Sequence, residues 1–129
     1  MPRFFNPKAI VAPASRYSQG ALCDHRARRL VISGQIGVRP DGTVADGLEA
    51  QMEVAWDNLE AVLAEAGMTV HDLVKITGYC VPAGSVAPFR TIRDRRLAGH
   101  APACTYIENV GLASPAFLFE LEGEAVRDD

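Results

Sequence analysis

From His100 the chain reads H-A-P-A-C-T-Y-I-E-N-V, then G-L-A-S-P, then A-F-L-F-E-L-E-G-E-A-V up to Val126, and this pattern is the most informative in the sequence. Apolar and acidic residues alternate in its last third. The two sets are Phe117, Phe119 and Leu121 on one face, and Glu120, Glu122 and Glu124 on the other. A period of two predicts a half-buried strand. Three carboxylates along one strand face are also typical of a face that is simply solvated, so this pattern alone leaves their role open.

Residues 103–110, just before this strand, also have a strand-like composition. The segment between the two, Gly111–Pro115, is typical of a turn. We therefore expect residues 103–110 and the acidic strand to form an antiparallel pair.

Working back along the chain, residues 48–66 form the clearest helix. Their apolar residues recur at three- and four-residue steps, and Gly67 lies where a left-handed C-cap is expected. Residues 73–81 read as an apolar strand. Ser85 can cap a second helix, in which Pro88 is tolerated in the first turn.

The N-terminal part reads as an extended lead-in over residues 1–20, followed by short strands at 21–23 and 30–38. The resulting order, ββαβαββ, predicts an α+β domain with an antiparallel-dominated sheet and two helices on one face. The other face then needs a partner.

The second helix carries arginines inside its apolar arc. Arg93 and Arg96 lie among Val86, Phe89 and Ile92 at about 100° per residue. Either both side chains run along the surface to water, or this face meets another subunit, where arginine is favoured.

Composition excludes several classes of protein. The 129 residues suffice for one domain, residues 1–129. We expect no nucleic-acid partner, because the net charge is −3, and no membrane partner, because no apolar run approaches the ~18 residues of a span. The N-terminus lacks a signal-like apolar core, and the three cysteines are scattered, so we expect a reduced, cytoplasmic protein. The histidines have no ligand spacing, and we expect neither a metal nor a cofactor.

Several motifs, in order, resemble the Rid (YjgF) family. They are S-R-Y-S-Q-G at 15–20, L-V-I-S-G-Q-I-G at 30–37, N-L-E-A-V-L-A-E-A-G-M at 58–68, D-L-V-K-I-T at 72–77, P-A-C-T at 102–105 and the E-x-E strand. The resemblance implies a chorismate-mutase-like fold and a homotrimer with clefts between subunits. It also implies hydrolysis of reactive enamines or imines to ketones and ammonia.

The same resemblance implies the site residues. Tyr17, Ser33 and Gly34 would line the cleft, and Glu120 would orient the attacking water. From the residues alone, Tyr17 could instead be a packed aromatic and Ser33 a turn hydroxyl.

Cys104 stands where the family has the arginine that grips the substrate carboxylate, a role a thiol cannot fill. Three readings follow. Cys104 could be a small filler in a protein with a different substrate. Another arginine, Arg90 or Arg93, could have taken over. Cys104 could itself be a nucleophile.

We therefore predict a hydrolytic enamine or imine deaminase acting on a small molecule, with catalytic residues Glu120 and Tyr17. The substrate-binding residues would be Ser33, Gly34, Cys104 and Arg90, and the substrate would not depend on the usual clamp. The alternative is a non-enzymatic trimer that binds a small molecule in the same cleft. A ribonuclease, a label that some relatives carry, is the least favoured because the chain lacks a basic, aromatic surface.

Overall fold

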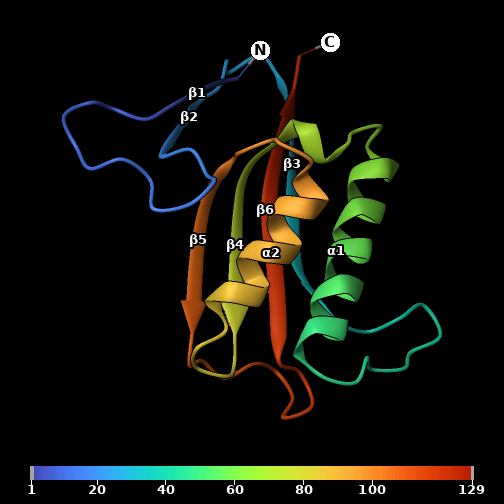
Figure 1. The fold of residues 1–129 in the computed structure, drawn as a ribbon. Helices are drawn as coiled ribbons and strands as arrows, with labels where there is room; N and C mark the ends of the chain where they lie inside the picture. The colour runs from blue at the N-terminus through green and yellow to red at the C-terminus, as the bar shows by residue number, and fades with distance from the viewer. Residues whose placement is uncertain (1, 129) are drawn as a thin grey trace.

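Four strands form the main sheet in the order β3-β6-β4-β5, and two strands form a separate small sheet, β1-β2 (Figure 1). The computed structural model describes residues 2–128. The elements are β1 Arg3–Phe5, β2 Gly20–Leu22, β3 Arg28–Ile36, α1 Leu48–Glu65, the 3-10 helix η1 Val70–Asp72, β4 Leu73–Cys80, α2 Val86–Leu97, β5 Ala103–Glu108 and β6 Phe119–Arg127. The α+β class is confirmed, with one strand, β1, in the segment expected to be a plain lead-in.

The acidic strand β6 lies inside the sheet, and the expected pairing of β5 with β6 is wrong. β6 pairs antiparallel with β3 on one side and with β4 on the other, whereas β5 pairs parallel with β4. The cause is the helix α2, which carries the chain back over the sheet so that β5 continues in the direction of β4 at the edge. The segment after β5 is a crossing loop rather than a hairpin turn.

A buried glutamine holds this crossing loop. Gln51 of α1 donates from Nε2 to the carbonyl oxygens of Ala45 and Ala116, at 3.1 and 3.0 Å, and its Oε1 accepts from the Leu118 amide at 2.8 Å. These three bonds satisfy backbone groups that would otherwise be buried without partners. They fix the point at which β6 enters the sheet.

Both helices cover the same face of the sheet (Figure 1). The alternation along β6 is as predicted, because Phe119, Leu121 and Ala125 are fully buried beneath the helices. The opposite face has no cover within residues 2–128 and carries Glu120, Glu122 and Glu124. Neither helix of the described chain is long and apolar enough to cross a membrane.

The C-terminal end of α1 agrees with the prediction, whereas the N-terminal end of α2 differs from it. Gly67 has φ +70°, and the amides of Gly67 and Met68 bond to the carbonyls of Ala64 and Leu63, which is a Schellman end as predicted. Ser85 is at the N-cap of α2, but its hydroxyl bonds to the Pro82 carbonyl and makes no cap. Glu108 of β5 accepts from the amides at 84 and 85 instead, placing a negative charge at the helix start.

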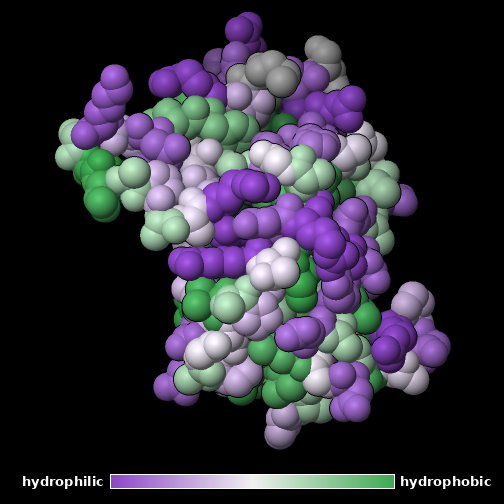
Figure 2. All heavy atoms as spheres, viewed as in Figure 1, coloured by the Kyte–Doolittle hydropathy of each residue, from purple (hydrophilic) through white to green (hydrophobic). Residues whose placement is uncertain are grey.

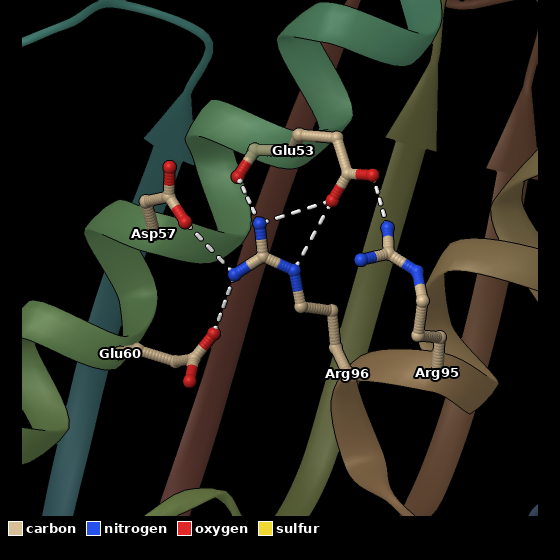
Figure 3. A network of polar contacts seen from close by, with 5 residues as sticks. All are labelled: Glu53, Asp57, Glu60, Arg95 and Arg96. Atoms are coloured by element: carbon tan, nitrogen blue, oxygen red, sulfur yellow. Dashed lines mark hydrogen bonds and ion pairs between the residues drawn. The ribbon is translucent and has the colours of Figure 1, made fainter.

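Arg93 and Arg96 of α2 do not run out to water, so the first of the two expectations for these side chains is wrong. Arg96 is 18% exposed in its side chain and reaches α1, where its Nη1 lies 2.8 Å from Asp57 Oδ1 and 2.7 Å from Glu60 Oε2, and its Nε 3.1 Å from Glu53 Oε1 (Figure 3). Burial opposes the charge on Arg96, but these carboxylates outweigh it and raise its pKa above the usual value. Arg95 also pairs with Glu53, so the network ties the two helices together.

Gly78 of β4 provides the space in which Phe89 of α2 packs against the sheet. A Cβ atom at this position would lie 2.3 Å from Cε1 of Phe89, whose side chain is fully buried. We expect Gly78→Ala to lower the free energy of unfolding by about 1–3 kcal/mol, because the ring has no room to move aside. Urea denaturation measures this change.

The matched control is Gly111→Ala, in a loop where a new Cβ would meet no atom within 4 Å. Its effect should stay within about 0.5 kcal/mol. Equal effects of the two substitutions would contradict the packing described for Phe89.

Candidate functional site

Ser33, Gly34 and Glu120 come together at a bulge on the uncovered face. The β3–β6 register shifts between Ile32 and Gln35, so Ser33 and Gly34 form the bulge. A Cβ at Gly34 would lie 2.0 Å from Oε2 of Glu120. Only glycine therefore allows the half-buried carboxylate of Glu120 to lie against the bulged backbone.

Tyr79 of β4 adds a hydroxyl to this acidic face. It is directly opposite Glu120 in the β4–β6 register, and its hydroxyl donates to Glu122. This hydrogen bond, together with burial and the charges of Glu122 and Glu120, raises the pKa of Tyr79 above its usual value. The phenol stays protonated at neutral pH, and the face combines carboxylates with a proton-bearing hydroxyl.

A second group of predicted residues lines a cavity of about 180 Å³ beside the sheet edge. Tyr17, Arg90 and Cys104 are in its wall, joined by Arg93. The remaining lining residues are Ser15, Val86, Phe89 and Tyr106. Its polar groups are thus drawn from the lead-in, α2 and β5.

Ser18 fixes the lead-in segment beside β5. Its amide donates to the Pro102 carbonyl at 3.1 Å, its hydroxyl donates to the Ala101 carbonyl, and it bridges Ala103 in parallel. This contact joins chain positions more than eighty residues apart. It explains how Tyr17 comes to share a cavity with Cys104.

Arg93 lies in this cavity wall with only 3% of its surface exposed. Its Nε is 2.9 Å from Asp94 Oδ1, its Nη1 is 3.7 Å from the Cys104 sulfur, and its Nη2 is 3.5 Å from the Ser15 hydroxyl. The guanidinium carbon lies 5.7 Å from the centre of the Phe89 ring, within cation–π range. The position of Arg93 within the apolar arc of α2 was the sequence signal; Ser15 had none.

Burial raises the pKa of the Cys104 thiol above its usual value, and the hydrogen bond and charge of Arg93 only partly offset this effect. The thiol therefore keeps its proton at neutral pH. A raised pKa is the opposite of what an activated nucleophilic cysteine requires.

The two groups lie on opposite faces of the sheet. In the ladders, Cys104 aligns with Ile76 and Gly123, on the helix side, whereas Glu120 points to the uncovered side. β4 also separates β5 from β6. One chain thus brings Tyr17, Arg90 and Cys104 together, and separately Ser33, Gly34 and Glu120, but does not join the two sets.

A larger cavity, of about 570 Å³, contains none of the predicted site residues. It is lined by Pro2, Phe4, Thr69, His71, Asp72, His100, Val126, Arg127 and Asp128. His71 and His100 approach here to 5.7 Å between ring centres, but no three metal-ligating side chains cluster anywhere within residues 2–128.

Comparison with known proteins places the chain in a family. Residues 7–127 match the family described as Endoribonuclease L-PSP. The RutC family protein YjgH of Escherichia coli is 38% identical over 79 residues, which cover 56% of this chain and 59% of that protein. The chain thus aligns with less than two thirds of the length of this relative.

Two other relatives align over nearly the whole chain. The 2-iminobutanoate/2-iminopropanoate deaminase of Salmonella typhimurium is 29% identical over 126 residues, covering 95% of this chain and 93% of that one. The structure of the Rid protein YyfB from Yersinia pestis superposes with a TM-score of 0.86 at 28% identity, covering 98% of both chains. Together with the family match over residues 7–127, these similarities show that the chain belongs to the Rid (YjgF) family.

Proposed function

We propose that this protein is a hydrolytic deaminase of small enamines or imines. The observation that carries the proposal is the Glu120 carboxylate, which lies against the bulged backbone of Gly34 on the uncovered sheet face. The name of the Salmonella typhimurium relative supports the reaction class. We expect a single domain that needs no cofactor.

The reaction needs little chemistry from the protein. An imine carbon is already electrophilic, so water adds to it, the nitrogen takes up protons, and the carbon–nitrogen bond breaks to leave a carbonyl compound and ammonia. Glu120 would orient the water and accept its proton during attack, and Tyr17 would contact the substrate. Backbone and hydroxyl groups at Ser33 and Gly34 would line the site.

A homotrimer would join the two groups of site residues. Because Glu120 and Cys104 are on opposite faces of one sheet, neither group can complete a site within its own chain. In the proposed assembly, the uncovered face of one subunit meets the sheet edge of the next, and a cleft forms between them. Burial of exposed Val31 and Ile107, 65% and 37% exposed, would favour this contact.

A non-enzymatic trimer that binds a small molecule in the same cleft remains the alternative, and the first experiment below separates the two. The acidic balance of the chain, −3 overall, does not favour a nucleic-acid substrate. The cytosol stays our predicted location.

Glu120→Gln tests the reaction. The substitution keeps the shape of the side chain but removes its basicity, so ammonia release from freshly generated 2-iminobutanoate should fall by about 10²–10⁴-fold. The matched control is Glu124→Gln on the same strand face, where the carboxylate pairs with Arg29 at 2.9 Å; its rate should stay near that of the wild type. A silent wild-type protein would favour the binding alternative, and an active Glu120→Gln would remove the proposed role.

The assembly is tested by multi-angle light scattering after gel filtration. We expect about three times the mass of one chain, because a single chain separates the two residue groups. A monodisperse monomer would contradict the shared cleft, whatever the activity of the protein.

The nucleophile reading of Cys104 predicts rapid alkylation at neutral pH, and we expect the opposite. The raised pKa of the buried thiol means that its thiolate appears only at higher pH than in the unfolded chain. Iodoacetamide at pH 7 should therefore label exposed Cys23 first, and Cys104 fully only in urea; peptide mass spectrometry measures both. Preferential labelling of native Cys104 at pH 7 would restore the nucleophile reading.

A further inference from the structure

We propose that Arg93 of α2 is the anion-binding group of the cavity at Cys104, and that the ligand of this cavity carries a compact carboxylate. The inference deepens the proposed function and rests on it for the identity of the substrate. It assigns the carboxylate contact to a helix residue, although the resemblance to the family places an arginine on the strand.

Arg93 is a buried charge whose two terminal nitrogens have weak hydrogen-bond partners. Asp94 binds Nε at 2.9 Å, which leaves the two terminal nitrogens to a sulfur at 3.7 Å and a hydroxyl at 3.5 Å. Sulfur is a weak acceptor, and 3.5 Å is at the outer limit of a hydrogen bond. A buried guanidinium gains from stronger acceptors at both positions.

Neither partner of the terminal nitrogens of Arg93, the Cys104 thiol or the Ser15 hydroxyl, carries a negative charge. The thiol of Cys104 is protonated at neutral pH because its burial disfavours the thiolate. Ser15 is neutral at all ordinary pH values. Among residues 2–128, the carboxylate paired with Arg93 is that of Asp94, whose side chain is 34% exposed and bonds to the Nε edge.

The residues that line the cavity carry positive charge. Its eight lining residues include two arginines, Arg90 and Arg93, and no acidic residue. Arg90 is exposed, whereas Arg93 is buried, so Arg90 can attract an anion and Arg93 can hold it. Figure 2 shows this helix-covered side, where hydrophilic side chains form a band across the middle of the surface.

A cysteine at position 104 is compatible with anion binding by Arg93. The short side chain of Cys104 leaves the space beside it to the guanidinium of Arg93, which approaches the sulfur to 3.7 Å. A long side chain at position 104 would compete for that space. The clamp can thus move from β5 to α2 without enlarging the cavity.

The shape of the Arg93 guanidinium and the size of the cavity suit one chemical class of ligand. Two terminal nitrogens of one guanidinium form a planar fork that matches the two oxygens of a carboxylate. The cavity of about 180 Å³ within one chain has room for a compact molecule. A short 2-oxo or 2-imino acid has both properties, so the substrate retains a carboxylate although the strand position holds a thiol.

Calorimetric titration tests the inference without depending on turnover. The probes are 2-oxobutanoate, the product expected from 2-iminobutanoate, and 2-oxobutanamide, its neutral analogue of the same size. We expect the wild-type protein to bind the acid at least tenfold more tightly than the amide, because only the acid forms charge-assisted bonds. Arg93→Met should remove this preference.

Arg95→Met is the matched control. Arg95 is on the same helix but pairs with Glu53 of α1 and lines no part of the cavity, so its loss should leave the preference for the acid intact. If Arg93→Met does not fold, as judged by circular dichroism, Arg93→Lys replaces it; an ammonium lacks the planar fork, and the preference should fall at least fivefold.

The inference is overturned if the wild-type protein binds neither probe, if it binds both equally, or if the preference survives loss of the Arg93 guanidinium. Its failure is distinguishable from failure of the proposed function. Glu120→Gln should bind the acid normally but release ammonia about 10²–10⁴-fold more slowly than the wild type. An Arg93-dependent preference in a protein without deaminase activity would uphold the binding site and refute the reaction.

Discussion

The insertion of β6 between β3 and β4 organises both faces of the sheet. Both edges of this strand are hydrogen-bonded, so its alternating side chains must divide between two fixed faces. Phe119 and Leu121 enter the core beneath the helices, and Glu120 and Glu122 are carried to the uncovered face. A slip of one residue would bury the carboxylates and expose the core, which makes the position of Glu120 a consequence of the fold.

The helix α2 uses its arginines for two different purposes. Arg96 pairs with three carboxylates of α1 and is largely shielded from water, which limits the rotation of α2 about its own axis (Figure 3). Arg93, three positions earlier, consequently points towards β5 and the Cys104 sulfur. The contact of Phe89 with Gly78 holds the same helix against the sheet. The orientation of the proposed anion-binding group thus depends on the ion pairs of Arg96, which lie outside the cavity.

The distribution of site residues over two faces links function to assembly. Each group alone is incomplete: the cavity at Cys104 has two arginines and two tyrosines but no carboxylate in its wall, and Glu120 lies on the opposite face of the sheet. Hydrolysis of an imino acid requires both an anchor for the substrate and a base for the water. Contact between copies would supply the two together, as the proposed trimer does.

Much of this protein could be read from its sequence because the relevant signals are local. The apolar spacing over residues 48–66 with Gly67 after it, and the alternation of Phe119, Glu120 and Leu121, determine a helix and a half-buried strand wherever they are placed. The order of the motifs along the chain was enough to identify the family. Tyr17, Ser33, Gly34 and Glu120 could be named because each belongs to such a motif.

The way in which these elements pack together could not be predicted from local sequence patterns. Neighbouring strands in sequence usually pair, but the α2 crossover sends β5 to the sheet edge and β6 to its interior, and no local pattern records that choice. The partners of Arg93 come from α2, β5 and the lead-in, so neither its burial nor its contact with Cys104 is visible in residue spacing. Local patterns in the chain therefore account for most of the helices and strands and for the family, whereas long-range packing sets which arginine lies beside the thiol.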